Sequence, residues 1–530
     1  MTNRKSTKRA LLGSVMAMVL CLAMLVGATF AWFTDTASTN VNKIQAGKLD
    51  VALEMKDAAG QWVSAEGKTL NWVKAAAGEQ VLWEPGCTYT LPELRVVNNG
   101  NLALKYKIQI TGIQGDAKLN EVIDWTINDA AIDLTEGHLT AGQQGDAFTI
   151  KGHMKETAGN DYQNLTIDGI GITVYATQDT VENDSFGNTY DANAKYPAMP
   201  YVTSHEALNT NLTLADIPTN EATGKHDPVE VALGNTEAGD IAYSEHSSGY
   251  TGKGVMLGST KLNSYAAAPA KAGEYTFVFK NGTINSAATG YSSIDNLKDT
   301  SVYMLVPGNS DVVFENMTFN GVVSFDIQMY TSPWSYLHSI TFKNCTFNGI
   351  VVGSCPAEKA TFDGCTFNNY TNTTYANNSN PIWWRAGTGY WGTGADESVH
   401  SLKEFTFVNN TVTSTRPVKI ERIGWNCTAG ITILDNTFDI SKQAGDSETK
   451  NMAINIGQRD NTSKFILTDD GNTISAGTAS LYTAALGSGS NQYVAVYGSK
   501  VLDRNGNDKV ITAMVWKTTT GETFDMKTID

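Results

Sequence analysis

The chain has 530 residues, of which 17% are charged and 9% aromatic, and its formal net charge is −16. The acidic balance argues against a nucleic-acid-binding protein, because nucleic acids attract basic surfaces. The aromatic content excludes an intrinsically disordered chain, and the length exceeds what one hydrophobic core usually serves. We therefore expect a folded protein of two or more domains.

The N-terminus has the pattern of a secretory signal. Arg4, Lys5, Lys8 and Arg9 precede an apolar run at residues 10–26, and small residues follow it. A basic start, an apolar centre and a small-residue end are the parts of an export signal. The sequence therefore predicts an exported protein.

Small residues favour cleavage between Ala31 and Trp32, which makes residues 1–31 the signal peptide. Cleavage after Ala28 is the alternative. An uncleaved N-terminal anchor is a third interpretation, because the apolar run is near the minimum length that spans a bilayer.

The next part of the chain has the pattern of antiparallel strands. Residues 48–56, 94–112 and 169–179 alternate apolar and polar side chains and are bounded by Gly, Asn, Asp or Pro. Alternation over short runs indicates strands with one buried face, and Asn99 and Gly100 are residues that tight turns favour. We predict a jelly-roll-like β-sandwich over residues 32–195.

Four segments carry a resemblance to a known family. They are "AWFTD" at residues 31–35, "IQAGKLDV" at 44–51, "WEPGCTYTLPELRVVNNGNLALKYKIQITG" at 83–112 and "ITVYATQ" at 172–178. In this order they resemble the TasA and camelysin family of exported bacterial matrix proteins, over residues 31 to about 191.

The resemblance implies processing and assembly. A signal peptidase of the SipW type would cut before Trp32, and the new N-terminal strand would complete the sheet of a neighbouring subunit, as edge strands allow. The partners would then be copies of the chain or other matrix subunits. The assembly residues implied are Trp32, Phe33, Asp35, Leu49 and Asp50. Alternatively, Trp32 and Phe33 pack on their own sandwich.

Relatives in this family have been labelled metalloproteases, but the zinc motif HExxH is absent from this sequence. His138 and His153 are isolated, and "HMKET" at residues 153–157 lacks the second histidine. We expect no metal or cofactor, except that the acidic run at residues 182–191 is either a calcium loop or a solvated linker.

An eight-residue repeat fills the second half of the chain. "VFKNGTIN" at residue 278 recurs in related form at residues 313, 341, 361, 406 and 432, with a weaker copy at 466. Such a period is typical of stacked repeat architectures. The fourth position of each copy is Asn281, Asn316, Asn344, Gly364, Asn409 or Asp435.

Only Gly, Asn and Asp occupy that position, and these residues most readily adopt left-handed backbone. We therefore predict a repeated sharp turn, with a ladder of stacked Asn side chains. Apolar runs recur between the copies, at residues 301–308, 322–330, 348–355, 380–389, 416–424, 451–458 and 481–489. Two strands and a turn in every repeat predict a parallel β-helix, right-handed as parallel crossovers are.

The β-helix would resemble the pectate-lyase-like superfamily at the level of fold, so the whole chain is predicted to be all-β. We assign the linker, N-terminal cap and first coils to residues 196–270 and the remaining coils with a C-terminal cap to residues 271–530. Residues 204–212 are expected to form a helix over the first coil. Cys345 and Cys365 would stack on adjacent coils, either as a disulfide or as a reduced apolar column.

Two interpretations of the β-helix remain open. Its strands carry Asp326, Arg385, Lys419, Glu421 and Arg422 without a stacked set of carboxylates, although a glycosidase needs two carboxylates. The aromatic insertions favour glycan binding instead, through Trp334, Tyr336, Trp383, Trp384, Arg385, Tyr390 and Trp391. Alternatively, these aromatics anchor long loops against the wall of the helix.

The sequence thus favours a non-catalytic surface or matrix protein, of the biofilm-fibre or adhesin kind. Its sandwich would direct export and assembly, and its β-helix would present a surface to glycans or to a host or cell surface. The alternative is an extracellular polysaccharide lyase or glycoside hydrolase of the β-helix type.

Overall fold

The computed structural model describes residues 48–73, 81–111, 113–115, 117–132, 135–168, 170–180, 194–220, 223–242, 251–262, 270–292, 301–327, 337–354, 357–385, 402–423, 428–441, 452–458, 464–476, 478, 480–483, 500–509, 511–517 and 523–526. The predicted signal, the cleavage site at Ala31 and Trp32, and the assembly residues Phe33 and Asp35 lie outside this set. The calcium-loop prediction at residues 182–191 also falls outside it.

Antiparallel strands form the N-terminal part, as the alternating sequence predicts. One sheet has the order β2–β1–β4, with β1 at Val51–Lys56, β2 at Trp62–Ser64 and β4 at Leu94–Asn98. A second has the order β3–β10–β7–β8, at Thr88–Thr90, Ile150–Met154, Ile123–Ile127 and Ala130–Ala131. A third has the order β12–β5–β9, at Gly171–Gln178, Leu104–Thr111 and Glu136–Leu139. The pair β11–β6 lies at Ile167–Asp168 and Gln114–Gly115, and short 3-10 helices η1 and η3 lie at Ala117–Val122 and Asn160–Tyr162.

These sheets share one apolar core. Leu104, Ile108 and Ile110 alternate along β5 and are buried in it with Leu94 and Ile150. The alternation buries one face of the strand, as the sequence pattern requires.

The turn between β4 and β5, which belong to different sheets, is closed by a buried side chain. Asn98 is fully buried, and its Nδ2 donates to the carbonyl of Leu102 (2.7 Å) while its Oδ1 accepts from the N–H of Gly100 (2.9 Å). An Asn side chain bonded to the backbone two residues on is a common way to fix a turn.

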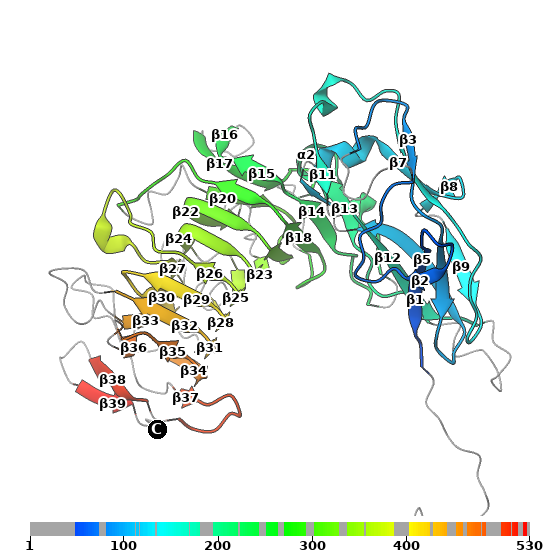
Figure 1. Cartoon of the computed structure of the whole chain (residues 1–530). Helices are drawn as coiled ribbons and strands as arrows, with labels where there is room; N and C mark the ends of the chain where they lie inside the picture. The colour runs from blue at the N-terminus through cyan, green and yellow to red at the C-terminus, as the bar shows by residue number, and fades with distance from the viewer. Residues whose placement is uncertain are drawn as a thin grey trace, which may run out of the picture. The chain divides into compact units, whose positions relative to one another are not determined.

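Parallel strands form the rest of the chain (Figure 1). A ten-stranded sheet has the order β13–β14–β18–β21–β23–β25–β28–β31–β34–β37, and all of its neighbours pair in parallel. These strands span Tyr201–Ser204, Val229–Ala232, Thr276–Lys280, Asp311–Glu315, Leu337–Lys343, Ala357–Asp363, Glu404–Val408, Thr428–Leu434, Lys464–Asp470 and Lys500–Leu502.

A fifteen-stranded sheet is built of two columns of strands. The first column holds β15, β19, the starts of β22 and β24, and β26, β29, β32 and β35; the second holds β16, β17, β20, the ends of β22 and β24, and β27, β30, β33 and β36. In chain order, β15 to β36 of this sheet span Asn235–Glu237, Gly239–Ala242, Thr251–Gly258, Thr283–Asn285, Ser301–Leu305, Thr318–Ile327, Thr346–Ser354, Thr366–Phe367, Ile382–Arg385, Thr411–Ser414, Val418–Ile423, Thr437–Ile440, Met452–Gln458, Thr473–Ile474 and Ser480–Thr483. All pairs are parallel except β16 with β17.

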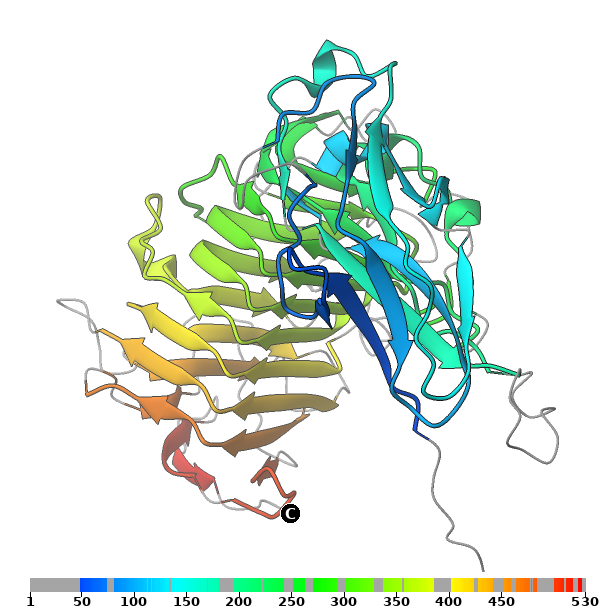
Figure 2. The ribbon, with the colours of Figure 1, turned by 45° about the vertical axis from the view of Figure 1, so that its right-hand side comes forward.

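The chain passes from the ten-stranded sheet to the first column, then to the second, and then returns one coil further along. Each strand pairs with its equivalent in the next coil, so the strands lie side by side in Figures 1 and 2. This is the connectivity of a parallel β-helix. The all-β prediction is confirmed, with antiparallel sheets first and long parallel sheets after them.

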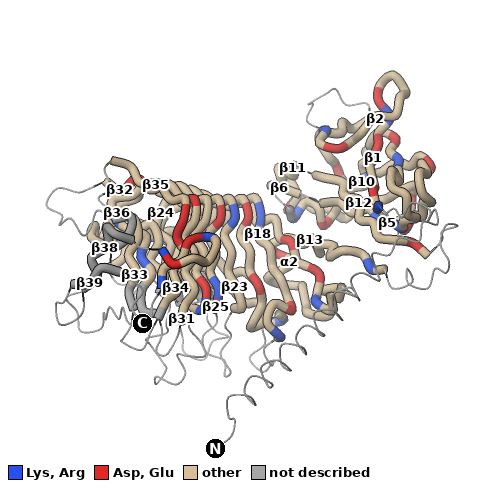
Figure 3. Tube along the Cα trace, turned by 90° about the horizontal axis from the view of Figure 1, so that it is seen from below, with Lys and Arg blue, Asp and Glu red and all other residues tan. Residues whose placement is uncertain are grey.

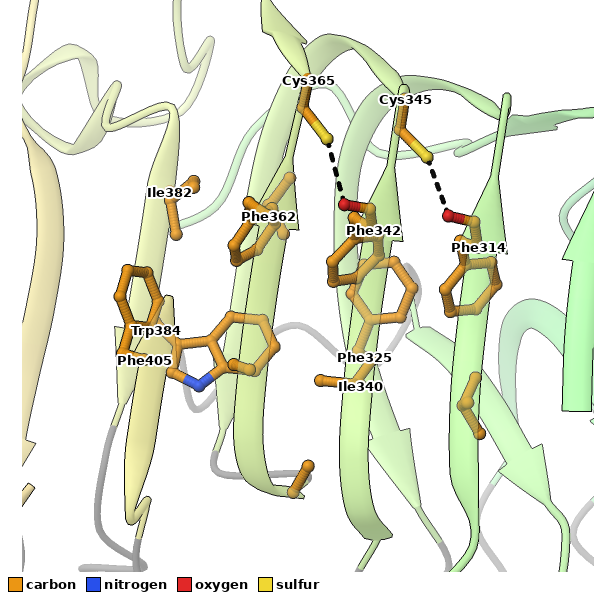
Figure 4. Packing of buried hydrophobic residues seen from close by; sticks show 14 of the residues in the cluster. Phe314, Phe325, Ile340, Phe342, Cys345, Phe362, Cys365, Ile382, Trp384 and Phe405 are labelled. Atoms are coloured by element: carbon orange, nitrogen blue, oxygen red, sulfur yellow. Dashed lines mark hydrogen bonds between the residues drawn. The ribbon is translucent and has the colours of Figure 1, made fainter. Parts of the chain in front are cut away.

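Stacked phenylalanines fill the interior of the coils. Phe314, Phe342 and Phe362 hold one repeat position, and their ring centroids are 5.3 Å and 4.7 Å apart in succession. Phe347 and Phe367 hold another, at 4.7 Å. These separations approach the spacing of neighbouring strands, so the repeat itself brings the rings into contact (Figure 4).

The first coil meets the short helix α2, at His205–Thr210, within the segment predicted to be helical. The Oγ of Ser204 caps it by accepting from the N–H of Ala207 (3.0 Å), and Leu208 and Leu212 are buried in the core of the coils. Two further 3-10 helices, η5 and η8, lie at Leu214–Asp216 and Ala376–Asn378. At the other end, β38 (Ile511–Lys517) and β39 (Thr523–Met526) pair with each other in an antiparallel hairpin, and β38 contacts β36.

Candidate functional site

The predicted turn positions all have left-handed backbone. Their φ angles are 53° at Asn281, 54° at Asn316, 53° at Asn344, 67° at Gly364, 57° at Asn409 and 56° at Asp435. Gly471 in the weakest repeat has φ 68°. Each turn therefore needs a residue that tolerates this conformation.

The side chains at this position form only a sparse ladder in the part of the chain that the structure describes. Asn316 Nδ2 donates to Asn281 Oδ1 at 3.4 Å, whereas Asn409 Nδ2 donates at 3.0 Å to Oδ1 of Asp363, which precedes the turn position of its repeat. The regular ladders lie at the fifth and eighth positions of the repeat, which sequence analysis missed.

The first of these is a buried turn column, one residue after the left-handed position. Its members are the buried Met317, Cys345, Cys365, Asn410 and Asn436, followed by the half-buried Asn472. Cys345 Sγ donates to the carbonyl of Phe314 (3.3 Å) and Cys365 Sγ to that of Phe342 (3.4 Å), as Figure 4 shows.

The three asparagines repeat this pattern with stronger donors. Their Nδ2 atoms donate in turn to the carbonyls of Phe362 (3.0 Å), Phe407 (2.8 Å) and Ile433 (2.7 Å). For these two cysteines and three asparagines the acceptor is the second residue of the preceding repeat, whereas Met317 Sδ accepts from the N–H of Gly282 (3.2 Å). From Cys345 onward the column therefore satisfies a carbonyl at each of these turns, as buried polar groups require. The aligned fifth residues, with only Gly, Met, Cys or Asn, were the signal that could have revealed it.

Cys345 and Cys365 are both free thiols and are 1% exposed. Burial raises the pKa of the Cys365 thiol, so it stays protonated at neutral pH. The reduced column is therefore the arrangement in the structure.

The second missed ladder lies on the outside of the first column. Asn320 Nδ2 donates to Asn285 Oδ1 (2.7 Å), Asn348 Nδ2 to Asn320 Oδ1 (2.9 Å), and Asn368 Nδ2 to Asn348 Oδ1 (2.6 Å). The final Asn of each repeat therefore bonds to its equivalent in the next coil.

The adjacent Trp383 and Trp384 lie on opposite faces of β27. Trp384 is fully buried, and its ring packs against Phe362 at 5.7 Å in the core of the coils. It cannot stack on a sugar ring, so the prediction that Trp384 binds a glycan is wrong. The cause is strand alternation, which turns one of two consecutive side chains inward.

Trp383 points outward and is half-buried. Lys419 Nζ lies 3.8 Å from the centre of its ring, and the Tyr291 ring lies 6.0 Å away. The tryptophan also packs on the small outer cluster of Val322, Ile350 and Val352. A cation over an aromatic face is attracted by the ring quadrupole, so Lys419 occupies a face that a sugar would need.

Two loops close over this outer cluster through a buried side chain. Asn372 is 1% exposed, its Oδ1 accepts from the N–H of Tyr291 (3.0 Å), and its Nδ2 donates to the carbonyl of Tyr291 (2.9 Å). Tyr370 Oη donates to the carbonyl of Thr289 (3.1 Å), and burial raises the pKa of its phenol. These contacts anchor loops against the wall of the helix.

The second column also aligns charged residues by backbone register. Arg385 pairs with Ser354 on one side and with Glu421 on the other, and Lys419 pairs with Trp383. Asp326 lies two coils earlier, paired with Tyr303. The side chains of Asp326, Arg385, Glu421 and Arg422, like the aromatics Trp334, Tyr336, Tyr390 and Trp391, lie outside the described set.

The remaining candidates lie in the N-terminal sheets. Leu49 is 40% exposed, and the carbonyl of Asp50 accepts from the N–H of Asn99 (2.7 Å), which positions the start of β1. His138 contacts Asp179 (2.7 Å) and His153 contacts Thr88 (2.8 Å) through Nδ1. Among the described residues no group of three or more His, Cys, Asp or Glu side chains could hold a metal ion.

Residues 6–59 match the family described as Camelysin metallo-endopeptidase. The match runs from the basic N-terminus to the turn after β1, and it ends well before residue 191, to which we expected the resemblance to extend. No curated protein and no solved structure matches the chain. The likeness to the pectate-lyase-like superfamily therefore rests on strand connectivity alone. Within the described ranges no helix is long and apolar enough to cross a membrane.

Proposed function

We propose that the chain is a secreted, non-catalytic protein of the cell surface or extracellular matrix. The observation that carries this proposal is the match of residues 6–59 to the camelysin family, because it covers most of the segment predicted to be an export signal and the first strand of the folded part. The family's description includes protease activity. We do not carry that activity over, since the sequence contains no HExxH motif.

The β-helix would serve as a rigid arm that presents a surface. Its single core contains buried side chains from Leu208 to Val501, so the coils share one continuous apolar interior. In stacked repeats each unit is stabilised by its neighbours, and the buried turn column supports this by bonding each coil to the one before it.

The N-terminal region would assemble copies of the chain through strand addition. Within the described residues β12 pairs with β5 alone, so one edge of this eight-residue strand offers backbone groups to an added strand. Trp32 and Phe33 would anchor that strand. The net charge of −16 should oppose assembly at low salt, and added salt should relieve the repulsion.

The test compares protein that starts at Trp32 with protein that starts at Leu49, by light scattering and negative-stain electron microscopy across a range of salt. Filaments from the longer form alone would support strand addition. A third protein keeps the full length but carries Trp32→Ser and Phe33→Ser, and it should assemble poorly if the two rings are anchors. Monomers in all cases would refute the assembly role.

Mass spectrometry of protein recovered from the culture medium tests the export role separately. We expect a mature N-terminus at Trp32, whereas a start at Thr29 would support the alternative cleavage site after Ala28. Retention of the intact chain in the membrane fraction would instead support an uncleaved anchor.

One observation favours a second function, that of an extracellular polysaccharide lyase or glycoside hydrolase. Register aligns Arg385 with Glu421 on adjacent coils and brings Lys419 beside them on β30. Glu and Lys are residue types that serve as general acids and bases. Incubation with neutral and acidic polysaccharides, followed by a reducing-end assay, tests it with Glu421→Gln as the matched variant. Release that the variant abolishes would establish the enzyme.

The aromatics Trp334, Tyr336, Tyr390 and Trp391, with Arg385, stay candidates for glycan binding, and Trp383 joins them only if Lys419 moves aside. Calcium binding at residues 182–191 likewise stays a prediction, to be checked by calorimetric titration with calcium.

A further inference from the structure

A regular polar surface covers the outside of the first column. Thr283, Thr318, Thr346, Thr366, Thr411, Thr437 and Thr473 stand in register on seven consecutive coils. Two residues along each strand stand Asn285, Asn320, Asn348, Asn368, Thr413, Asp439 and Ser475. We call these two rows the threonine–asparagine face.

Both rows point away from the core. Between them on the first six strands lies an inward residue, such as Phe347 or Phe367, that is no more than 2% exposed, whereas the equivalent Ile474 on the seventh strand is 42% exposed. Asn348, Thr366, Asn368 and several later members are exposed to solvent. The face therefore presents hydroxyls, methyl groups and amides at the repeat of neighbouring strands, about 4.8 Å.

The asparagine row is held in place before any ligand arrives. Each of Asn320, Asn348 and Asn368 donates one hydrogen bond to the previous asparagine, at 2.6 Å to 2.9 Å. An amide has two N–H donors and two acceptor lone pairs, so an inner member of the ladder keeps a donor and an acceptor for an outside partner. Groups that are already ordered lose less entropy on binding.

The face is uncharged over most of its length, although the chain carries 92 acidic and basic residues (38 Lys and Arg, 54 Asp and Glu). The ten positions from Thr283 to Thr413 contain only Thr and Asn. Charges are instead paired on the neighbouring ten-stranded sheet, where Lys280 Nζ lies 2.7 Å from Glu230 and 3.5 Å from Glu315. Figure 3 shows blue and red segments side by side on the coils near β18.

We propose that the threonine–asparagine face binds an extended, neutral polysaccharide that runs along the stack of coils. A pyranose chain is itself a periodic array of hydroxyl groups, each a donor and an acceptor, with apolar C–H faces that suit threonine methyl groups. An uncharged face favours a neutral polysaccharide, and the net charge of −16 on the protein repels acidic polymers.

The same surface is a poor interface for a second copy of the chain. Stable protein interfaces have an apolar centre, whereas this face is made of hydroxyl and amide groups, and two copies would bring two acidic molecules together. The inference relies on the proposed function only in placing the protein outside the cell, where such polymers are found.

The experiment measures binding of the full chain to a soluble neutral β-glucan and to polygalacturonate, by affinity electrophoresis and isothermal titration calorimetry. The face variant carries Thr366→Glu and Thr411→Glu, which stand on adjacent coils. The matched control carries Thr361→Glu and Thr406→Glu, which stand on the same two coils but on the outer side of the ten-stranded sheet. A third variant, Thr366→Val with Thr411→Val, removes the hydroxyls and keeps the shape.

We expect the wild type and the control to bind the β-glucan, and the face variant to bind it at least about tenfold more weakly, as the loss of one or two hydrogen bonds predicts. The valine variant should lie between them. Circular dichroism and thermal unfolding confirm that each variant is folded.

Several results would overturn the inference. They are equal binding by all variants, no binding of the β-glucan by the wild type, preference for polygalacturonate, and a wild-type dimer that the face variant abolishes in sedimentation. The last result would assign the face to a second copy. Failure of export or of filament formation is measured in separate experiments, so it leaves this result intact.

Discussion

Replacing Asn436 by alanine should test whether the buried turn column stabilises the stack of coils. Its side chain is 1% exposed and donates through Nδ2 to the carbonyl of Phe407 (2.8 Å) and to Asn472 Oδ1 (2.9 Å). Its Oδ1 accepts from the backbone N–H and the Nδ2 of Asn410, at 2.9 Å and 3.0 Å. One side chain thus joins three successive coils.

Alanine would remove all four hydrogen bonds. The carbonyl of Phe407 and the backbone N–H of Asn410 would then be buried without this partner. A buried group that loses its partner costs about 1–3 kcal/mol, so two such groups predict a loss of about 2–6 kcal/mol. The matched control is Thr437→Ala, because Thr437 is exposed and its hydroxyl contacts only Thr473 Oγ1 (3.2 Å) among the bonds described for it. Surface substitutions of this kind change the free energy of unfolding by about 0.5 kcal/mol or less.

Urea unfolding followed by circular dichroism measures both free energies on the same protein. The reasoning fails if the free energies of unfolding of the Asn436 and Thr437 variants differ by less than about 1 kcal/mol, because leaving one buried polar group without a partner costs at least that much. It would then follow that water replaces the amide at this turn.

Three further changes follow from the structure. Asn316→Gly should leave the thermal midpoint almost unchanged while Asn316→Val lowers it, since φ is 54° there and a β-branched residue costs about 1–2 kcal/mol in left-handed backbone; equal midpoints would contradict this. Gly353→Ala should lower the thermal midpoint, because its Cβ would overlap the Trp384 ring, and a second change of Trp384→Leu should restore part of the loss. Burial lowers the pKa of His205, whose Nε2 lies 2.7 Å from the Met256 carbonyl oxygen. Below about pH 6.5 the imidazole of His205 is protonated in the unfolded chain but stays neutral in the folded chain. The free energy of unfolding should therefore be highest above that pH and should fall as the pH drops toward the lowered pKa of the folded state. Urea midpoints at pH 7.5 and pH 5 check this, and His205→Gln should flatten the difference.

The turns could be predicted from the sequence because backbone strain is local. Asn281 and Gly364 stand where φ is positive, and the residues that tolerate such φ angles are few. The period of these residues then predicted stacked coils, since each copy of the repeat needs a neighbour to cover its apolar side chains.

The position of the ladders could not be predicted in the same way. Asn344 and the adjacent Cys345 differ by one residue, yet the first lies in an exposed turn and the second is 1% exposed and bonded to Phe314. Which of two neighbouring positions faces inward depends on how one coil sits on the next. That register is a property of the stack.

The sequence by itself determined the all-β class and the repeat, because composition, local backbone preference and period are properties of short segments. Tertiary structure decided which side chains meet. It buried Trp384 beside Phe362, turned Trp383 outward under Lys419, and aligned the threonine–asparagine face over seven coils. The physical reason is that these contacts join residues 20 or more positions apart, and only the hydrogen-bonded register of parallel strands fixes which of them become neighbours.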